Sequence, residues 1–291
     1  MYYPYFRGKQ FDLLALKTLI EEERLSKKII PIIEPVKNSP TLKKFLALTQ
    51  TKNHFIFIIE NPQAGDFLKE EGYTELQELD MPKAAIIDQS LETMALVPEL
   101  LVVFESSPVL MSDWQVSTSK VLVHEEFRLL QKIQGELILS EDPFTRLPRT
   151  SFYLEKEDEL FSNTHLTFHK KGYIGFSDFS IDSRIYYDQS YPSPILSLHL
   201  VYFEGGNLRI HHFLSEEELP SQKQKFMDLM NKITSFGIDK LCGEQPTLGL
   251  QLLLENQAQD KFPGMGVMRK AAVMHHMELM SRYLDHHFCY D

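Results

Sequence analysis

The sequence predicts an α/β fold, namely a (β/α)8 TIM-like barrel with an added β-hairpin and C-terminal helices. Three observations predict this fold. Short apolar runs recur through the first 180 residues at intervals that suit one strand and one helix, and most of them stop at an acidic residue. Such runs, rich in Val, Ile, Leu and Phe, are typical of buried parallel strands. The repetition continues to eight strands, whereas open doubly wound sheets usually stop at about five or six.

The predicted strands begin with Tyr2 to Phe6, which Pro4 keeps short because proline lacks a backbone donor. The later strands are predicted over residues 29–33, 55–59, 84–87, 100–104, 121–123, 137–139 and 173–176. The acidic residues that follow them are Glu34, Glu60, Asp88, Glu105, Glu125, Glu141, Asp142 and Asp178. In α/β folds the carboxyl ends of parallel strands gather the functional groups, so a site is expected at this edge.

Helices are predicted between these strands, over residues 11–24, 41–49, 64–79, 91–98, 126–133 and 155–169. The link from Glu105 to Val121 is too polar and broken for a good helix. Past the eighth strand, apolar runs over 195–203 and 208–214 flank a Glu-Gly-Gly-Asn turn, which indicates a hairpin because glycine supplies the positive φ of a tight turn. Three further helices are predicted over 216–235, 246–257 and 267–288.

Size and composition agree with one large domain. The chain has 291 residues, of which 43% are hydrophobic and 24% charged, so it can bury a full core. No linker rich in Gly, Ser or Pro divides it. We therefore predict a single barrel domain over residues 1–291, in which 190–291 form the hairpin and a helical decoration.

Net charge and targeting signals limit the partners and the location. The formal net charge of -11 argues against long nucleic acid, because that affinity comes from Lys and Arg releasing counterions. No basic stretch followed by an apolar one opens the chain, and no apolar run approaches the roughly 18 residues of a membrane span. Cys242 and Cys289 form no C-x-x-C motif. These features predict a soluble cytoplasmic protein with reduced thiols.

The acidic strand ends need compensation if they converge, because neighbouring carboxylates raise one another's pKa. One solution is a divalent cation such as Mg²⁺, with Glu34, Glu60 and Asp88 as oxygen ligands. A second is ion pairing with nearby arginines and lysines. The third is that some acids only cap a helix or face water, and Asp88 is well placed to cap the helix that follows. Glu34, Glu60, Asp88 and Asp178 are the candidate catalytic carboxylates.

Arg7 and Lys9 leave the first strand at the same edge as the acids. A guanidinium there can bind phosphate or carboxylate through paired hydrogen bonds, which points to a small anionic substrate. The alternative is a structural ion pair of Arg7 with Glu34 or Asp178. The candidate substrate contacts are Arg7, Lys9, Asn61, Arg184 and Arg269.

Histidines occur in pairs, and one pair, His275-His276, stands in the last predicted helix. At 100° per residue His275 faces away from the apolar stripe of this helix, and His276 lies on its margin. His276 is a candidate catalytic residue, with packing and hydrogen bonding of its ring as the alternative. Before this helix, the Phe-Pro-Gly-Met-Gly segment at 262–266 together with Arg269 could hold a phosphate, or form a flexible joint between helices.

Several motifs of the chain resemble one known family. They are Tyr3-Pro4-Tyr5-Phe6-Arg7-Gly8-Lys9-Gln10, Leu14-Ala15-Leu16, Pro31-Ile32-Ile33-Glu34-Pro35-Val36, Asn61-Pro62-Gln63-Ala64-Gly65 and Gly175-Phe176-Ser177-Asp178-Phe179. Together they look like the bacterial branch of the phage beta-protein family, over most of the chain and most specifically in its first 65 residues. The resemblance transfers no catalytic residue. It implies a phage-defence or mobile-element context and a small partner protein encoded by a neighbouring gene.

Two functions remain open. In the first, the chain is an enzyme that binds a small anionic, phosphorylated or nucleotide-like substrate at the acidic barrel mouth and acts as a metal-assisted hydrolase or phosphodiesterase. In the second, the barrel is a non-catalytic scaffold or sensor that binds a small partner protein or a phage component through its C-terminal hairpin and helices. Acids at nearly every strand end favour the enzyme, because a scaffold has little need of them.

Overall fold

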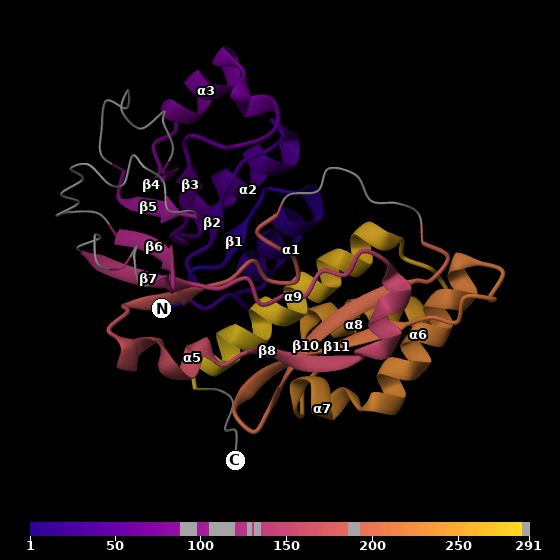
Figure 1. The fold of residues 1–291 in the computed structure, drawn as a ribbon. Helices are drawn as coiled ribbons and strands as arrows, with labels where there is room; N and C mark the ends of the chain where they lie inside the picture. The colour runs from indigo at the N-terminus through magenta and orange to yellow at the C-terminus, as the bar shows by residue number, and fades with distance from the viewer. Residues whose placement is uncertain (88–97, 105–119, 127–129, 131–134, 186–192, 287–291) are drawn as a thin grey trace. The chain divides into compact units, whose positions relative to one another are not determined.

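The computed structural model describes residues 1–291 apart from 88–97, 105–119, 127–129, 131–134, 186–192 and 287–291 (Figure 1). The chain forms two compact units. The first consists of Met1–Leu13, Lys27–Asp142 and Thr164–Phe179, and the second of Leu14–Ser26, Pro143–Asn163 and Ser180–Asp291. The two units alternate along the chain, which explains why no linker marks a boundary. A single domain over 1–291 stays a prediction.

The first unit contains a parallel sheet that is nearly closed into a barrel, with helices around it. Its strands, in spatial order, are β1 (Tyr5–Phe6), β2 (Ile32–Ile33), β3 (Phe57–Ile59), β4 (Lys83–Ile86), β5 (Leu100–Val103), β6 (Lys120–His124), β7 (Glu136–Ser140) and β9 (Gly175–Ser177). The backbone N–H groups of Tyr3 and Tyr5 donate to the carbonyls of Phe176 and Asp178, both at 2.8 Å, and so bring the ends of the sheet together. The predicted (β/α)8 TIM-like fold is confirmed.

Helices follow the first strands, as predicted. They are α1 (Gln10–Glu21), α2 (Pro40–Thr51) and α3 (Glu70–Gln77). The helix predicted over 64–79 is shorter than expected, because a 3-10 turn, η1 (Asp66–Leu68), comes before α3. Ser39 begins α2, because its hydroxyl accepts from the Leu42 N–H at 3.2 Å and Pro40 occupies the first turn, where a missing N–H costs nothing. Most of the helices predicted over 91–98 and 126–133 lies outside the described residues.

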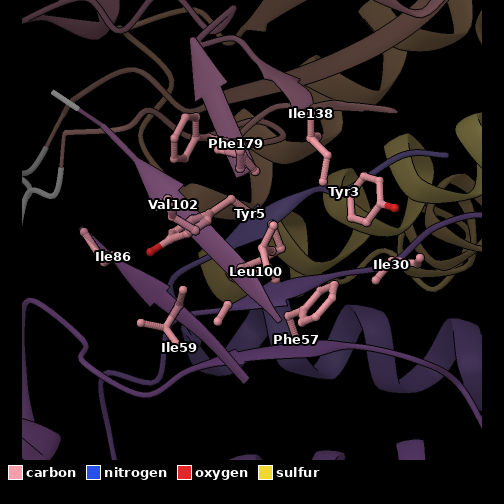
Figure 2. Close-up of a cluster of buried hydrophobic side chains, with 13 residues drawn as sticks. Tyr3, Tyr5, Ile30, Phe57, Ile59, Ile86, Leu100, Val102, Ile138 and Phe179 are labelled. Carbon is pink, nitrogen blue, oxygen red and sulfur yellow. The ribbon is translucent and has the colours of Figure 1, made fainter. Parts of the chain in front are cut away.

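Side chains alternate between the barrel interior and its outer surface, as the period of two in a strand requires. Figure 2 shows the interior, where Tyr3 and Tyr5 of the first strand segment meet Phe57, Val102 and other residues. The outward residues pack in a separate cluster, which includes Ala85, Leu101, Val103, Val121, Val123, Leu139 and Tyr173. The alternation decides which residue at each strand end faces the mouth of the barrel.

The second unit is built on an antiparallel sheet. Its strands are β10 (Ser197–Glu204), β11 (Asn207–Leu214) and β8 (Asp158–Ser162), with β11 in the centre. Its principal helices are α6 (Gln222–Phe236), α7 (Ile238–Cys242), α8 (Leu248–Ala258) and α9 (Met265–Leu284). The hairpin and the three long C-terminal helices were predicted, and the short α7 was not. In the described part of the chain, no helix combines the length and the apolar character needed to cross a membrane.

The middle of α9 is buried on all sides, so the expectation that His275 faces away from the packed side is wrong. His275 and His276 both have 0% exposure. The His275 ring donates from Nε2 to the carbonyl of Val201 in β10 at 2.7 Å and accepts at Nδ1 from the Thr247 hydroxyl at 2.8 Å. Because β10 lies on one side of α9 and α8 on another, the helix has no solvent face at this point.

The single helix predicted over 155–169 is also wrong. The segment contains the end of a 3-10 helix (η4, Thr150–Glu155), strand β8, a short α5 (Thr164–Thr167) and the start of a 3-10 turn (η5, Phe168–Lys171). Strand β8 forms because β11 offers it a pairing edge, and the Asp158 carboxylate accepts from Arg209 of that strand. Such pairing over about 50 residues of sequence leaves no local signal, since β-propensity depends on the neighbouring strand.

Candidate functional site

The interior alternation places a set of polar residues at the carboxyl-end mouth of the barrel. Each stands two positions beyond an inward-facing core residue, as Arg7 does after Tyr5, Glu34 after Ile32 and Asn61 after Ile59. This edge carries the active site in TIM-barrel enzymes. Arg7, Glu34 and Asn61 were all predicted as site residues, and the structure brings them together.

Glu34 is the centre of this group. Its side chain is buried, with 3% exposure, yet both carboxylate oxygens have partners. Oε2 accepts from the Tyr5 hydroxyl at 2.9 Å and lies 3.5 Å from Nε of Arg7, and Oε1 accepts from the backbone N–H of Gln63 at 2.8 Å. Burial, and then the charge of Glu34, raise the pKa of Tyr5 well above its usual value, so this hydroxyl remains a donor. We call Tyr5, Arg7, Glu34, Asn61 and Gln63 the Glu34 cluster.

Asn61 fixes the loop that carries Gln63. Its side chain copies the pairing of a strand, because Nδ2 donates to the Ile86 carbonyl at 2.7 Å and Oδ1 accepts from the Ile86 N–H at 2.8 Å. The side-chain amide of Gln63 in turn donates from Nε2 to the Asn61 backbone carbonyl at 2.8 Å. The β3–β4 pairing thus extends past the end of β3 and aims the Gln63 N–H at Glu34.

Two glycines let the loops after β1, β2 and β3 touch through their backbones. Gly8 has a φ of +54°, and a Cβ on it would lie 3.0 Å from the Glu34 carbonyl. Gly65 has a φ of +90°, and a Cβ on it would lie 1.9 Å from the Val36 carbonyl. Three motifs of the sequence, around Gly8, Glu34 and Gly65, therefore form one packed surface at the mouth.

Gly65→Ala should destabilise the protein strongly. The substitution combines a positive-φ cost of roughly 1–2 kcal/mol with an overlap against backbone, for which overpacking typically costs about 1–3 kcal/mol. We expect a loss of about 3 kcal/mol in the free energy of unfolding, measured by urea denaturation.

Gly172→Ala is the matched control, because Gly172 has a φ of +87° but its Cβ would meet nothing within 4 Å. This variant should lose only the positive-φ term of roughly 1–2 kcal/mol. Equal losses in the two variants would show that the contact between Gly65 and Val36 adds nothing.

The other predicted acids do not join the cluster. Glu60 follows the inward Ile59 and so faces the outer side, where burial raises its pKa against the opposing charge of Lys83. Asp178 accepts from the Tyr2 hydroxyl at 2.7 Å, and the Tyr2 ring stacks on the outward Phe176. Both acids therefore stand one position away from the residues of their strands that face the mouth. Asp88 lies outside the described residues.

The remaining predicted residues are distributed over both units. Lys9 is partly exposed in the first unit. Arg184 is partly exposed in the second unit, where Arg269 donates to Asp182 at 2.9 Å. Nδ1 of the buried His276 lies 2.9 Å from the Ser180 hydroxyl, and burial lowers the pKa of this histidine to about 3. The second unit thus surrounds His276 with core rather than with solvent.

Sequence reasoning missed other residues that face the mouth. His124 stands two positions after the inward Leu122, and its Nε2 lies 3.2 Å from Glu126. Ser140 and Ser177 are register partners on β7 and β9. Ser177 has 1% exposure, and no described residue hydrogen-bonds its hydroxyl. Counting by twos from the middle residues of β6 and β7, Leu122 and Ile138, would have found His124 and Ser140.

Metal ligands were predicted at Glu34, Glu60 and Asp88. Within the described ranges, no group of three or more His, Cys, Asp or Glu side chains is arranged to hold a metal ion. Both oxygens of Glu34 already accept from protein donors. Because Asp88 falls outside the described residues, the metal site stays a prediction.

Comparison with models of protein families, with curated proteins and with solved structures found no significant match for this chain.

Proposed function

We propose that this protein is an enzyme that binds a small anionic substrate, phosphorylated or nucleotide-like, at the mouth of the barrel. One observation carries the proposal: Arg7 stands at the mouth beside a buried carboxylate that is itself fixed by Tyr5 and by the Gln63 N–H. A guanidinium has the shape and charge to bind phosphate or carboxylate through paired hydrogen bonds. Such a fixed cation loses little entropy when an anion binds.

The groups available for chemistry lie on neighbouring strands. His124 supplies an imidazole for general acid–base catalysis, and Ser140 and Ser177 supply hydroxyls. Glu34 acts as a positioning residue, because the Tyr5 hydroxyl and the Gln63 N–H fix its carboxylate, which in turn pairs with Arg7. Coordination of Mg²⁺ by Glu34 would require these hydrogen bonds to be exchanged, so no step is assigned to a metal.

Arg7→Gln should abolish ligand binding while the protein stays folded. The test is a thermal-shift and calorimetric screen of nucleotides and sugar phosphates against the wild type. We expect a hit whose affinity falls at least about 100-fold in Arg7→Gln, since charge-assisted bonds to phosphate are worth roughly 1.5–3 kcal/mol each. Glu34→Gln should weaken the same ligand because Arg7 loses its anchor.

Glu60→Gln is the matched control, since Glu60 follows a neighbouring strand but faces outward. It should bind like the wild type. Equal effects of Glu60→Gln and Glu34→Gln, or a wild-type protein that binds no anion in the screen, would contradict the proposal.

The scaffold alternative has less support. The hairpin proposed as part of its interface has half of the residues of β10 and five of the eight in β11 buried. Deletion of 195–214 would therefore remove core residues together with the exposed ones. A phage-defence context and a neighbouring partner protein stay predictions that rest on the resemblance of the motifs.

A further inference from the structure

A pocket of about 400 Å³ lies within the second unit and is lined by the start of β10 and the first turns of α9. Helix α9 contributes Met265, Met268 and Ala272 to its wall, and β10 contributes Ser197 and His199. Pockets of about 300–1,000 Å³ with an apolar lining and a few polar groups are typical of small-molecule sites. The proposed function at the barrel mouth uses none of these residues.

The polar and the apolar side chains of the pocket come from different elements. Ser197 and His199 are two positions apart on β10, and a strand places every second side chain on the same face. Met265, Met268 and Ala272 follow one another at intervals of three and four residues, which keeps them on one face of α9. The pocket therefore suits a molecule with a polar edge and an apolar body.

His199 ends a chain of hydrogen bonds. Nδ1 of His199 lies 2.7 Å from Nδ1 of His212, and Nε2 of His212 lies 3.2 Å from Oε1 of Glu159. The Glu159 carboxylate also pairs with Lys156 and accepts from the Thr145 hydroxyl at 3.2 Å. An ionised carboxylate can only accept, so His212 carries its proton on Nε2.

The direction of the chain then follows for His199. Burial lowers the pKa of both histidines, that of His199 to about 3, so both rings are neutral near neutral pH. With its proton on Nε2, His212 accepts at Nδ1, and His199 must donate from Nδ1. Nε2 of His199 is left as an acceptor at the pocket wall, and no described residue hydrogen-bonds it.

Aromatic rings hold this acceptor in place. The Tyr153 ring lies 4.8 Å from that of His199 and 4.5 Å from that of His212, and Phe144 meets the His199 ring edge-on at 5.2 Å. The Tyr153 hydroxyl is anchored in turn, because it donates to the Thr145 carbonyl at 2.9 Å. A preorganised acceptor of this kind loses little entropy when it binds a donor.

The wall of the pocket favours an uncharged ligand. Arg269 also lines the pocket, but its guanidinium is engaged in an ion pair, in which it donates to the Asp182 carboxylate at 2.9 Å. A carboxylate or phosphate of a ligand beside His199 would place one acceptor against another. Because a charge that leaves water without a partner loses its solvation, this arrangement is unfavourable.

We propose that this pocket binds an uncharged small molecule that donates an O–H or N–H group to Nε2 of His199. Phenols, alcohols and amides with an apolar body are the class of ligand that fits. The apolar body packs against Met265, Met268 and Ala272 of α9. His199 acts here in recognition and transfers no proton.

Histidine ring NMR on the full chain tests the chain of hydrogen bonds without any substitution. At neutral pH, His199 should be the neutral Nδ1–H form with an unprotonated Nε2. Glu159→Gln should mix the two neutral forms, because an amide can donate as well as accept. A proton on Nε2 of His199 in the wild type would overturn the proposal.

Three related probes test the ligand chemistry on the wild type. 4-Methylphenol has an apolar body and a donor, 4-methylanisole is its methyl ether and has no donor, and the 4-methylbenzoate anion has a charge and no donor. We expect 4-methylphenol to shift the His199 Nε2 resonance and to bind about tenfold more tightly than either relative, since a hydrogen bond and the unpaired acceptor left without it are worth about 1–3 kcal/mol.

Two variants assign the two parts of the site. His199→Phe keeps a ring but has no acceptor, so 4-methylphenol and 4-methylanisole should bind to it alike. Met265→Ala, at an exposed position on the rim, should remain folded and weaken both probes by the same factor, because it removes contact with the shared apolar body. Leu68→Ala, at an exposed position of the first unit, is the control and should bind like the wild type.

The outcomes decide the proposal. If 4-methylanisole or the 4-methylbenzoate anion binds to the wild type as tightly as 4-methylphenol, the ligand class is wrong. If no probe moves the His199 Nε2 resonance at millimolar concentration, the pocket is not a site for this class. Arg7→Gln should leave all of these results unchanged, because the proposed site at the barrel mouth involves other residues.

Discussion

Acidification from pH 7 to pH 5 should cost the protein several kcal/mol of its free energy of unfolding. His275 and His276 are fully buried, and desolvation lowers their pKa values from 6.5 to about 4 and about 3. An unfolded histidine takes up its proton as the pH falls through about 6.5, whereas the folded one does not until about pH 4 or below. The unfolded state therefore binds more protons in this window, and stability falls with the pH.

The size of the effect follows from linkage. At pH 5 each of these histidines lowers the free energy of unfolding by about 2 kcal/mol. This is about 1.36 kcal/mol for each pH unit between pH 5 and the pKa of about 6.5 in the unfolded state. Most carboxylates titrate below this window, so the histidines dominate the slope. Urea denaturation followed by circular dichroism at pH 7, 6 and 5 measures it.

Two variants isolate the source of this pH dependence. His276→Gln removes one titrating ring and should flatten the slope of stability against pH between pH 7 and 5 by about one proton. His169→Gln, at an exposed position, should leave the slope as in the wild type. A wild-type stability that is constant over this range would contradict the burial of neutral histidines.

Gly249→Ala should destabilise the second unit although alanine is the better helix former. Alanine gains about 1 kcal/mol over glycine in a helix interior. However, a Cβ at Gly249 would lie 2.1 Å from the Ala271 carbonyl and 2.8 Å from the His275 N–H, both backbone atoms of α9. Helices α8 and α9 would have to separate, which would also stretch the Thr247–His275 hydrogen bond.

We expect the clash to win and the free energy of unfolding to fall by at least about 2 kcal/mol, given typical overpacking costs of about 1–3 kcal/mol or more. Gln251→Ala, at an exposed position of the same helix, is the control and should stay within about 0.5 kcal/mol of the wild type. A more stable Gly249→Ala protein would show that the helices can move apart at little cost.

The strands of the barrel could be predicted because each is a local apolar run, and a buried parallel strand needs no other signal. It was harder to predict whether the residues just beyond each strand face the inside or the outside of the barrel. Glu34 continues the inward phase of Ile32, but Glu60 follows the inward Ile59 and takes the outward phase. An acidic residue at a strand end is thus weaker evidence for a site than its position in the inward–outward alternation of that strand. This position can be assigned only once the inward residues of the strand are known.

Other features depend on partners far along the chain. Strand β8 forms only by pairing with β11. The contacts of His212 with His199 and with Glu159 depend on the register that sets His199 opposite His212. The sequence contains these histidines but does not show that they pair. The burial of His275 likewise depends on α8 and β10 covering both sides of one helix, which the amphipathic pattern of α9 alone does not reveal.

The alternation of the two units along the chain has a consequence for synthesis. Neither unit is a contiguous fragment: the first is complete only when residue 179 has left the ribosome, and by then residues 14–26 and 143–163 of the second are already present without their partners. These segments must wait for residues 180–291 before β8 can pair with β11. A fragment ending at 179 would expose them permanently, so expression of either unit by simple truncation should yield aggregation-prone material.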